Sequence, residues 1–418
     1  MKIGRHIFII KNIPYWLLIL SFLILNVGAL ISMHTPIQTG ALISLISIFS
    51  FFFLSKRILK SKSFYYKNVF NFFICIELLS CGFGMFSQYS YFLQNHIIIL
   101  IYGISYLVLP QLLFFNLGRC IDNHKLYKSV QFILYCNAFL IGMGIIFSMF
   151  QPSFYLSFVE RALPSQYEVY GTSPRLVSYL GDSMSIGVIC SSSFILSISL
   201  LSGKKRCILA LIFCIGCIMS MQRGAWISMT ASTLLYVFVF SKIKIFSFKI
   251  NRRVAFVLSA VLITAIYLIY KIQTSWSDEF LFFDILTRRF DRIGGAASER
   301  TNQWISIIDA AMHNWGGLGI GTMSHKGVNF GFPITCPDGN YFRILGDIGF
   351  IGLLCFLFLN FLALLHLYKL RQWSVLCVII IYLMQAIGTN VFDLFYSSFI
   401  YWFFIGVSFK DKINLCIR

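Results

Sequence analysis

Charge of either sign is scarce in this sequence of 418 residues. Charged residues make up 12% of the chain, and acidic residues are the scarcer, with 15 Asp and Glu against 34 Lys and Arg. Soluble globular chains carry about 25% charged residues, so this chain has too little polar surface to coat a soluble fold of its size. The composition therefore argues against soluble enzymes, nucleic-acid-binding modules and disordered regulators.

Sequence patterns that indicate other chemistries are also missing. The chain has no HExxH motif or carboxylate cluster that would suggest a metal site, and no Walker A or GxGxxG motif that would bind a nucleotide. We therefore expect no metal, no cofactor and no nucleic-acid partner. The only Cys-x-x-Cys pair, Cys214 and Cys217, lies inside an apolar run, where cysteine packs as a small hydrophobe.

Long apolar runs dominate what is present. Hydrophobic residues make up 58% of the chain, and the mean hydropathy is +0.80. A membrane-spanning helix needs about 20 apolar residues. The sequence thus predicts an all-α polytopic membrane protein that forms a single integral membrane domain over residues 1–418. The twelve predicted spans are 13–32, 36–54, 69–87, 96–117, 128–150, 177–201, 207–221, 224–240, 254–271, 345–367, 373–389 and 391–409.

Basic residues indicate which loops face the cytoplasm. When the N-terminus is placed inside, every loop assigned to the inside carries Lys or Arg, as the positive-inside rule requires. We therefore expect both termini in the cytoplasm and two large loops, 151–176 and 272–344, on the outer face. In the second loop, Ser298 is predicted to cap a helix that starts near Glu299 and ends at Asn314. This amphipathic helix would lie at the membrane surface or over a cavity mouth. Its predicted apolar face comprises Trp304, Ile305, Ile308, Ala311 and Met312.

Some basic residues fall on the outer side, against the rule, and most of them are arginines. The planar guanidinium of arginine binds phosphate or carboxylate at two points. Anion binding is one explanation for these residues, and salt bridges to loop acids such as Glu160, Glu168 and Asp291 are the other. The outer basic residues are Arg161, Arg175, Arg223, Lys271, Arg288, Arg289, Arg292, Arg300, Lys326 and Arg343.

Three of these arginines fall in outer-side segments that also contain glycines and aromatic residues. Arg175 precedes a span, and Arg223 lies in the tight turn Met221-Gln-Arg-Gly-Ala225 between two spans. Arg300 is followed four residues later by Trp304 and then by the glycine-rich stretch Gly317-Leu-Gly-Ile-Gly321. A fourth segment opens a late span and reads Asp338-Gly-Asn-Tyr-Phe-Arg-Ile-Leu-Gly-Asp-Ile-Gly-Phe-Ile-Gly352.

In this order, the segments resemble the O-antigen ligase/polymerase superfamily of bacterial membrane glycosyltransferases. The turn at 221–225 resembles the family's SRGA-like turn, with Gln222 in place of Ser. The Arg300 segment is similar to an Arg, a Trp four residues on, and a PLLGVGLG-like stretch. The segment 338–352 is similar to (H/D)N-Y-L-x-x-L-x-E-x-G-x-x-G, with Asp347 in place of Glu. Because it lacks the His that the ligase branch carries before the Asn, the chain is most similar to the O-antigen polymerase (Wzy) branch.

The resemblance implies a substrate, a site and a location. The substrate would be an undecaprenyl-diphosphate-linked oligosaccharide handled on the outer face of the bacterial inner membrane, and a chain-length regulator is a candidate partner beside membrane lipids. Fixed Arg donors stabilise a diphosphate leaving group, and we assign this role to Arg175, Arg223 and Arg300. The attacking sugar hydroxyl needs a base, for which Asp338 is the best-placed carboxylate. Asn340 and Tyr341 are candidates to hold sugar hydroxyls.

Each assignment has a structural alternative. Arg223 could anchor at the membrane interface, as could Tyr341, and Asp338 could simply form an Asp-Gly turn. Asp182 could pair with Arg175 or serve a purely structural role. At the level of function, an O-antigen ligase is the alternative within the class. A flippase for lipid-linked oligosaccharide is the alternative from another class, and the buried acids Glu77, Asp182 and Asp393 would suit a proton-coupled transporter.

Overall fold

The structure is a computed structural model that describes residues 2–33, 46–48, 50, 64–85, 93–173, 175–240, 293–324, 327, 332, 334, 336, 338–410, 412, 413 and 415. Within these residues the chain is helical and contains no strand, so the predicted all-α fold is confirmed. The helices are α1 (Lys2–Ser32), α3 (Phe64–Met85), α4 (Leu93–Gly103), η2 (Ile104–Val108), α5 (Leu109–Cys120), α6 (Asn123–Phe150), α7 (Ser153–Ala162), α8 (Pro164–Tyr170), η3 (Ser178–Leu180), α9 (Ser183–Leu200), α10 (Gly203–Met219), α11 (Arg223–Leu234), η4 (Leu235–Phe240), α14 (Ile293–His313), α16 (Asn340–Lys369), α17 (Trp373–Gln385) and α18 (Phe395–Ser408).

Most predicted spans coincide with these helices. Six helical segments in the described part of the chain are long and apolar enough to cross a membrane. The spans predicted at 36–54 and 254–271 lie mostly or wholly outside the described residues, and each of the others overlaps a helix. The span predicted from 177 begins later, because Asp182 caps α9 by accepting hydrogen bonds from the backbone N–H groups of Met184 and Ser185, both at 2.8 Å.

The amphipathic helix in the second outer loop exists, but its predicted start is wrong. α14 begins at Ile293, so Ser298 lies within the helix and is not its cap. The predicted end is confirmed, since Asn314 follows the last helical residue and its amide donates to the carbonyl of Ala310 (2.9 Å). The predicted apolar face is divided: Ala311 is buried, whereas Ile305, Ile308 and Met312 are exposed.

Glycine allows two of the helices to approach closely. A Cβ atom at Gly118 of α5 would lie 2.0 Å from the carbonyl oxygen of Phe403 in α18, and one at Gly406 of α18 would lie 2.0 Å from that of Phe115 in α5. Small residues at helix contacts are typical of membrane proteins, where association depends on van der Waals packing.

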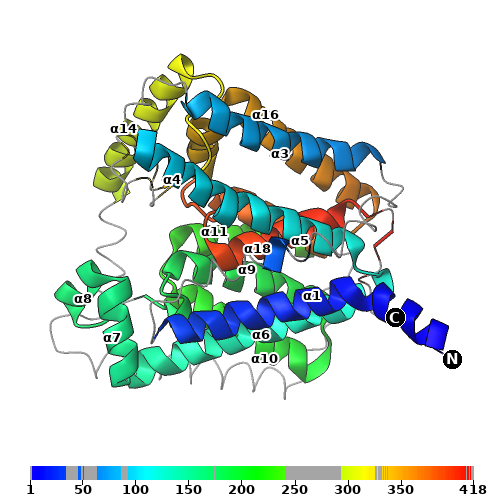
Figure 1. The fold of residues 1–418 in the computed structure, drawn as a ribbon. Coiled ribbons are helices and arrows are strands. Elements are labelled where there is room, and N and C mark those ends of the chain that lie inside the picture. The colour runs from blue at the N-terminus through cyan, green and yellow to red at the C-terminus, as the bar shows by residue number, and fades with distance from the viewer. Residues whose placement is uncertain are drawn as a thin grey trace.

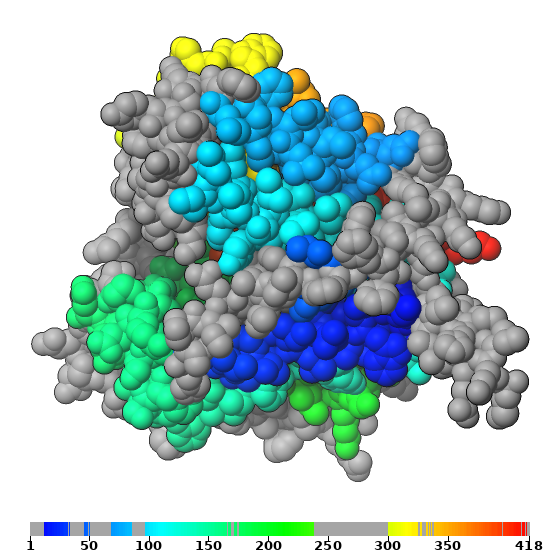
Figure 2. Space-filling view, viewed as in Figure 1, coloured from blue at the N-terminus to red at the C-terminus, as the bar shows by residue number. Residues whose placement is uncertain are grey.

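Apolar side chains cover the outside of the bundle. Figure 2 shows α3 and α4 side by side on one face of the molecule. Large apolar side chains on these helices are exposed, including Phe72, Leu79 and Phe83 of α3 and Ile101 of α4. Such a surface suits a lipid environment, because it would be unfavourable in contact with water.

Segments predicted on the same side of the membrane lie together. The N and C marks lie at one end of the bundle, and α7, α8 and α14 lie at the opposite end (Figure 1). At the first end, the Lys410 amine donates to the carbonyl of Arg119 (3.1 Å), and the Gln372 amide donates to that of Ile413 (2.9 Å). These contacts join three regions that the charge pattern assigns to the same side of the membrane.

The absolute orientation gives a prediction that labelling can test. We expect α8 on the periplasmic side and the α9–α10 turn in the cytoplasm, because basic loops stay inside. In a background without accessible thiols, a cysteine at Ser165 should react with an impermeant maleimide added to intact cells. A cysteine at Lys204 should react only after the cells are opened. Labelling of Lys204→Cys in intact cells would contradict this orientation.

Candidate active site

A cavity of about 380 Å³ is lined in part by residues of α9, α11 and α14. Arg175, Arg223, Arg300 and Asp338, which are far apart in the sequence, all line it. The remaining lining residues are Met184, Met221, Gln222, Gly224, Ile227, Met384, Gln385, Ile387, Gly388 and Thr389. The cavity therefore combines three guanidinium groups and one carboxylate with an apolar wall, a composition that fits a ligand with an anionic part and a lipid part.

The carboxylate and one guanidinium are paired. Nη2 of Arg300 lies 2.7 Å from Oδ2 of Asp338. The Arg300 side chain is 38% exposed and that of Asp338 is 17% exposed, so a ligand in the cavity can reach the pair. A pair this accessible adds little to stability because solvent screens it.

Arg300 and Trp304, which are four residues apart, both contact Asp338. The two residues lie one turn apart on α14 and therefore on the same face. The Trp304 indole N–H donates to the backbone carbonyl of Asp338 (2.9 Å), while Arg300 binds the carboxylate of the same residue. The indole stacks on Phe342 of α16 with ring centroids 4.5 Å apart. Together these contacts fix Asp338 against α14.

Gly339 makes the turn after Asp338. Its φ of +106° is one that L side chains rarely adopt, and a Cβ atom there would lie 3.1 Å from the Trp304 indole nitrogen and 3.3 Å from the carbonyl oxygen of Ile387. The Asp-Gly dipeptide thus forms a turn, and the Asp338 side chain also reaches the cavity. The two interpretations of Asp338 from the sequence are compatible.

Arg223 is the first residue of α11, in the short turn after α10. The turn is held by Trp226, whose indole N–H donates to the carbonyl of Cys217 in α10 (2.8 Å). Gln222, which stands where the family pattern has Ser, packs against α9, and a Cβ atom at Gly187 would lie 2.2 Å from its side-chain oxygen. The turn is therefore fixed to both neighbouring helices, which orients the half-buried Arg223 side chain.

Arg175 lies in the segment between α8 and α9. The Ser173 hydroxyl donates to the Arg175 carbonyl (2.9 Å), and the N–H of Leu176 donates to the carbonyl of Met219 at the end of α10 (2.9 Å). The segment is thus joined to the same turn that carries Arg223. Because Asp182 caps α9, its carboxylate has a structural role.

Asn340 and Tyr341 do not line the cavity. Asn340 is fully buried, and its side-chain oxygen accepts from the N–H of Phe392 (3.0 Å). The Tyr341 hydroxyl donates to the carbonyl of Leu383 in α17 (2.8 Å). In the described contacts both residues join α16 to the region around α17, and their assignment to sugar hydroxyls stays a prediction.

The glycine-rich stretch packs on a break in α16. Gly349 has a φ of +74° and is non-helical, which frees two carbonyl groups of the preceding turn. The N–H of Leu318 donates to the carbonyl of Gly346 (2.8 Å), and the N–H of Gly319 donates to that of Asp347 (2.9 Å). A Cβ atom at Gly349 would lie 2.0 Å from the carbonyl oxygen of Trp315. The two glycine motifs of the sequence therefore form one contact.

Replacing Gly349 with alanine should destabilise the protein. Because of the positive φ and the contact with the Trp315 carbonyl, we expect the free energy of unfolding to fall by about 1–3 kcal/mol. Gly142 in α6 is the matched control, because a Cβ atom there meets nothing within 4 Å. Thermal unfolding in detergent should give a lower Tm for Gly349→Ala and not for Gly142→Ala. Equal Tm values for Gly349→Ala and the wild type would contradict the close contact.

Other ionisable groups lie apart from the cavity. The Gln111 amide faces the buried Glu77 carboxylate, with its nitrogen 3.1 and 3.3 Å from the two oxygens in the orientation that satisfies both groups. Burial raises the pKa of the Cys336 thiol to about 12, so this thiol stays protonated at neutral pH. Among the residues described, no three His, Cys, Asp or Glu side chains group as a metal site would require.

Sequence reasoning missed the wall of the cavity that follows α17. Gln385 ends that helix, and its amide donates to the hydroxyls of Ser191 and Ser228, both at 2.9 Å. Ile387, Gly388 and Thr389 continue the wall. A polar residue in the last turn of an apolar span was the available signal.

Comparison with known proteins supports the resemblance that the motifs indicate. Residues 208–357 match the protein-family model described as O-Antigen ligase. This stretch contains Arg223, Arg300 and Asp338, and the match supports the resemblance to the O-antigen ligase/polymerase superfamily. The family covers ligases and polymerases, and its members are membrane glycosyltransferase-like enzymes. A search of curated proteins found no match.

Proposed function

We propose that this chain polymerises undecaprenyl-diphosphate-linked O-antigen oligosaccharide repeats on the periplasmic face of the inner membrane. The observation that most supports this function is the convergence of Arg175, Arg223, Arg300 and Asp338 in one cavity. A cavity with three guanidinium groups suits a diphosphate, and the apolar wall suits the first isoprene units of its lipid.

The proposed reaction transfers the donor glycan to the acceptor unit. The hydroxyl oxygen of the acceptor's terminal sugar attacks the anomeric carbon of the donor chain. The bond from that carbon to the diphosphate breaks, and its electron pair goes to the diphosphate oxygen, where the arginines stabilise the charge. The hydroxyl proton goes to the carboxylate of Asp338. The products are a lengthened lipid-linked glycan and undecaprenyl diphosphate.

The ion pair between Arg300 and Asp338 gives the diphosphate a second role. A bound diphosphate would compete with the carboxylate for the Arg300 guanidinium, since both are anions whose oxygens accept its N–H groups. As the diphosphate takes the guanidinium, the carboxylate becomes available to the acceptor hydroxyl. Donor binding would in this way prepare the base.

An O-antigen ligase that transfers glycan to lipid A-core is the second candidate. The family description favours it, whereas the absence of His before Asn340 favours the polymerase. The surface lipopolysaccharide of a deletion strain separates them: one repeat on the core indicates that a polymerase was lost, and none indicates that a ligase was lost. Purified protein in detergent should also lengthen glycan on lipid carriers, which a transporter cannot do.

A further inference from the structure

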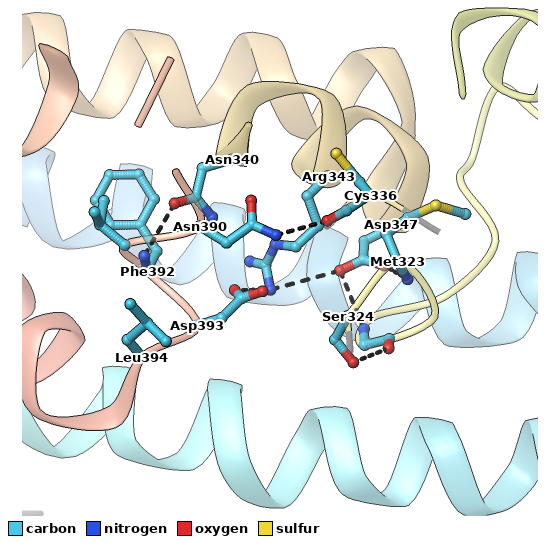
Figure 3. Close-up of polar contacts among 12 residues, drawn as sticks. Met323, Ser324, Cys336, Asn340, Arg343, Asp347, Asn390, Phe392, Asp393 and Leu394 are labelled. Atoms are coloured by element: carbon cyan, nitrogen blue, oxygen red, sulfur yellow. Dashed lines mark hydrogen bonds and ion pairs between the residues drawn. The ribbon is translucent and has the colours of Figure 1, made fainter. Parts of the chain in front are cut away.

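Arg343 is an outer-side arginine that does not line the cavity. It lies in the first turns of α16, and the residue is 4% exposed. A buried guanidinium within a span is unfavourable unless it is paired, so its partners indicate its role. Its Nη1 atom lies 3.9 Å from the carboxylate of Asp347, and it also contacts the carboxylate of Asp393 (Figure 3).

Asp347 holds the glycine-rich loop. Its carboxylate accepts hydrogen bonds from the N–H of Gly321 (3.1 Å), the hydroxyl of Thr322 (3.0 Å) and the N–H of Met323 (2.8 Å). The loop is in turn joined to the segment before Asp338, because the N–H of Cys336 donates to the carbonyl of Met323 (3.1 Å). Through Asp347 and the glycine-rich loop, Arg343 is therefore connected to the segment that carries Asp338.

Asp393 follows the segment 387–389, which also lines the cavity. The N–H of Asn340 donates to the carbonyl of Ala386 (2.9 Å), and the side-chain oxygen of Asn340 accepts from the N–H of Phe392 (3.0 Å). Residues 387–389, which line the cavity, lie between these two contacts. The ion pair with Arg343 is a third attachment of this segment to α16, and the one that carries charge.

We propose that Arg343 is a positioning residue for glycan transfer. By pairing with Asp347 and Asp393 it fixes the wall at 387–389 relative to Asp338, so that the diphosphate and the acceptor hydroxyl meet at the reacting distance. This inference rests on the proposed function. A misplacement of about 1 Å in such a site lowers turnover about a hundredfold.

A double variant separates positioning from stability. Arg343→Met alone leaves the Asp393 carboxylate buried without a counter-charge, so the yield of folded protein should fall. Arg343→Met with Asp393→Asn removes both charges, and Asp347 keeps its three hydrogen-bond donors. We expect the folded yield to recover while transfer in detergent stays about a hundredfold below wild type.

Two further measurements are independent of turnover. Binding of undecaprenyl diphosphate to the double variant should match the wild type, because the three cavity arginines are intact. Backbone amide exchange, followed by mass spectrometry, should be about tenfold faster across 386–393 than in the wild type, since one attachment is lost. Arg343→Lys is a second variant in case the yield does not recover. It keeps the charge but not the planar guanidinium, so the protein should remain folded. Transfer should still be about a hundredfold slower, and amide exchange across 386–393 should still be faster than in the wild type.

Wild-type transfer by a folded double variant or by Arg343→Lys would overturn the inference. The ion pair of Arg343 and Asp393 would then contribute only to stability. Unchanged exchange across 386–393 would overturn it as well. If the wild-type protein transfers no glycan to lipid carriers, the proposed function fails instead. Exchange in this segment would then still decide whether Arg343 positions the cavity wall.

Discussion

Glycan transfer is expected to fall about a hundred- to thousandfold when Arg223 or Arg300 is replaced by alanine, which on surface lipopolysaccharide amounts to loss of polymer. The reason is that negative charge grows on the diphosphate as its bond to the sugar breaks. Removal of one fixed donor from such a site raises the barrier by about 2.7–4 kcal/mol. Both arginines line the cavity, and Arg223 is held in a turn that is fixed to α9 and α10.

Charge alone should not restore activity. Lysine at either position keeps the positive charge and loses the planar fork that binds two oxygens at once, so Arg223→Lys and Arg300→Lys should be poor substitutes. Arg161→Ala is the matched control. Arg161 is an exposed outer-side arginine that does not line the cavity, and its guanidinium donates to the backbone carbonyls of Ser157 and Met33. Its loss should therefore leave polymer length unchanged.

The measurement is the length distribution of surface lipopolysaccharide, with the membrane level of each variant checked by immunoblot. Wild-type polymer length in both Arg223→Ala and Arg300→Ala would remove the arginines from the proposed site. Loss of polymer in Arg161→Ala at a normal membrane level would indicate instead that positive charge on the outer side supports polymerisation without lining this cavity.

The membrane spans could be predicted because their signal is local. Twenty apolar residues in a row specify a span whatever surrounds it, and a basic loop specifies its side. The break at Gly349 could not be predicted, because it depends on the approach of Trp315, which is distant in the sequence. Likewise, the helix start at Ile293 was not predicted, because serine favours the N-cap position, whereas Ser298 lies within α14.

The candidate site could be predicted in part for a similar reason. Arg175, Arg223 and Arg300 stood out because they violate a charge rule that each residue reveals on its own, and the cavity brings them together. Which outer arginine faces a cavity and which is buried in an ion pair depends on side-chain direction. Arg343 has the same sequence signal as the others, yet it contacts Asp347 and Asp393.

The second large effect is expected for Asp338→Asn, which should fail in transfer even when donor binding survives. The diphosphate needs no acid once the arginines bind it, whereas the acceptor hydroxyl is a weak nucleophile and needs a carboxylate near it. The substitution is close to isosteric. Asparagine is a good turn residue before Gly339, and the bond from Trp304 goes to the backbone carbonyl of residue 338, which is unchanged.

The same substitution therefore distinguishes a base from a turn former. If Asp338 only shapes the turn, Asn at this position should support full-length polymer, because the turn and the indole contact persist. If the carboxylate accepts the proton, polymer should be lost at a normal membrane level. Undecaprenyl diphosphate should bind no more weakly, because the substitution frees the Arg300 side chain from its ion pair. Full-length polymer in Asp338→Asn would return this residue to a structural role and move the search for the base to another group in the cavity.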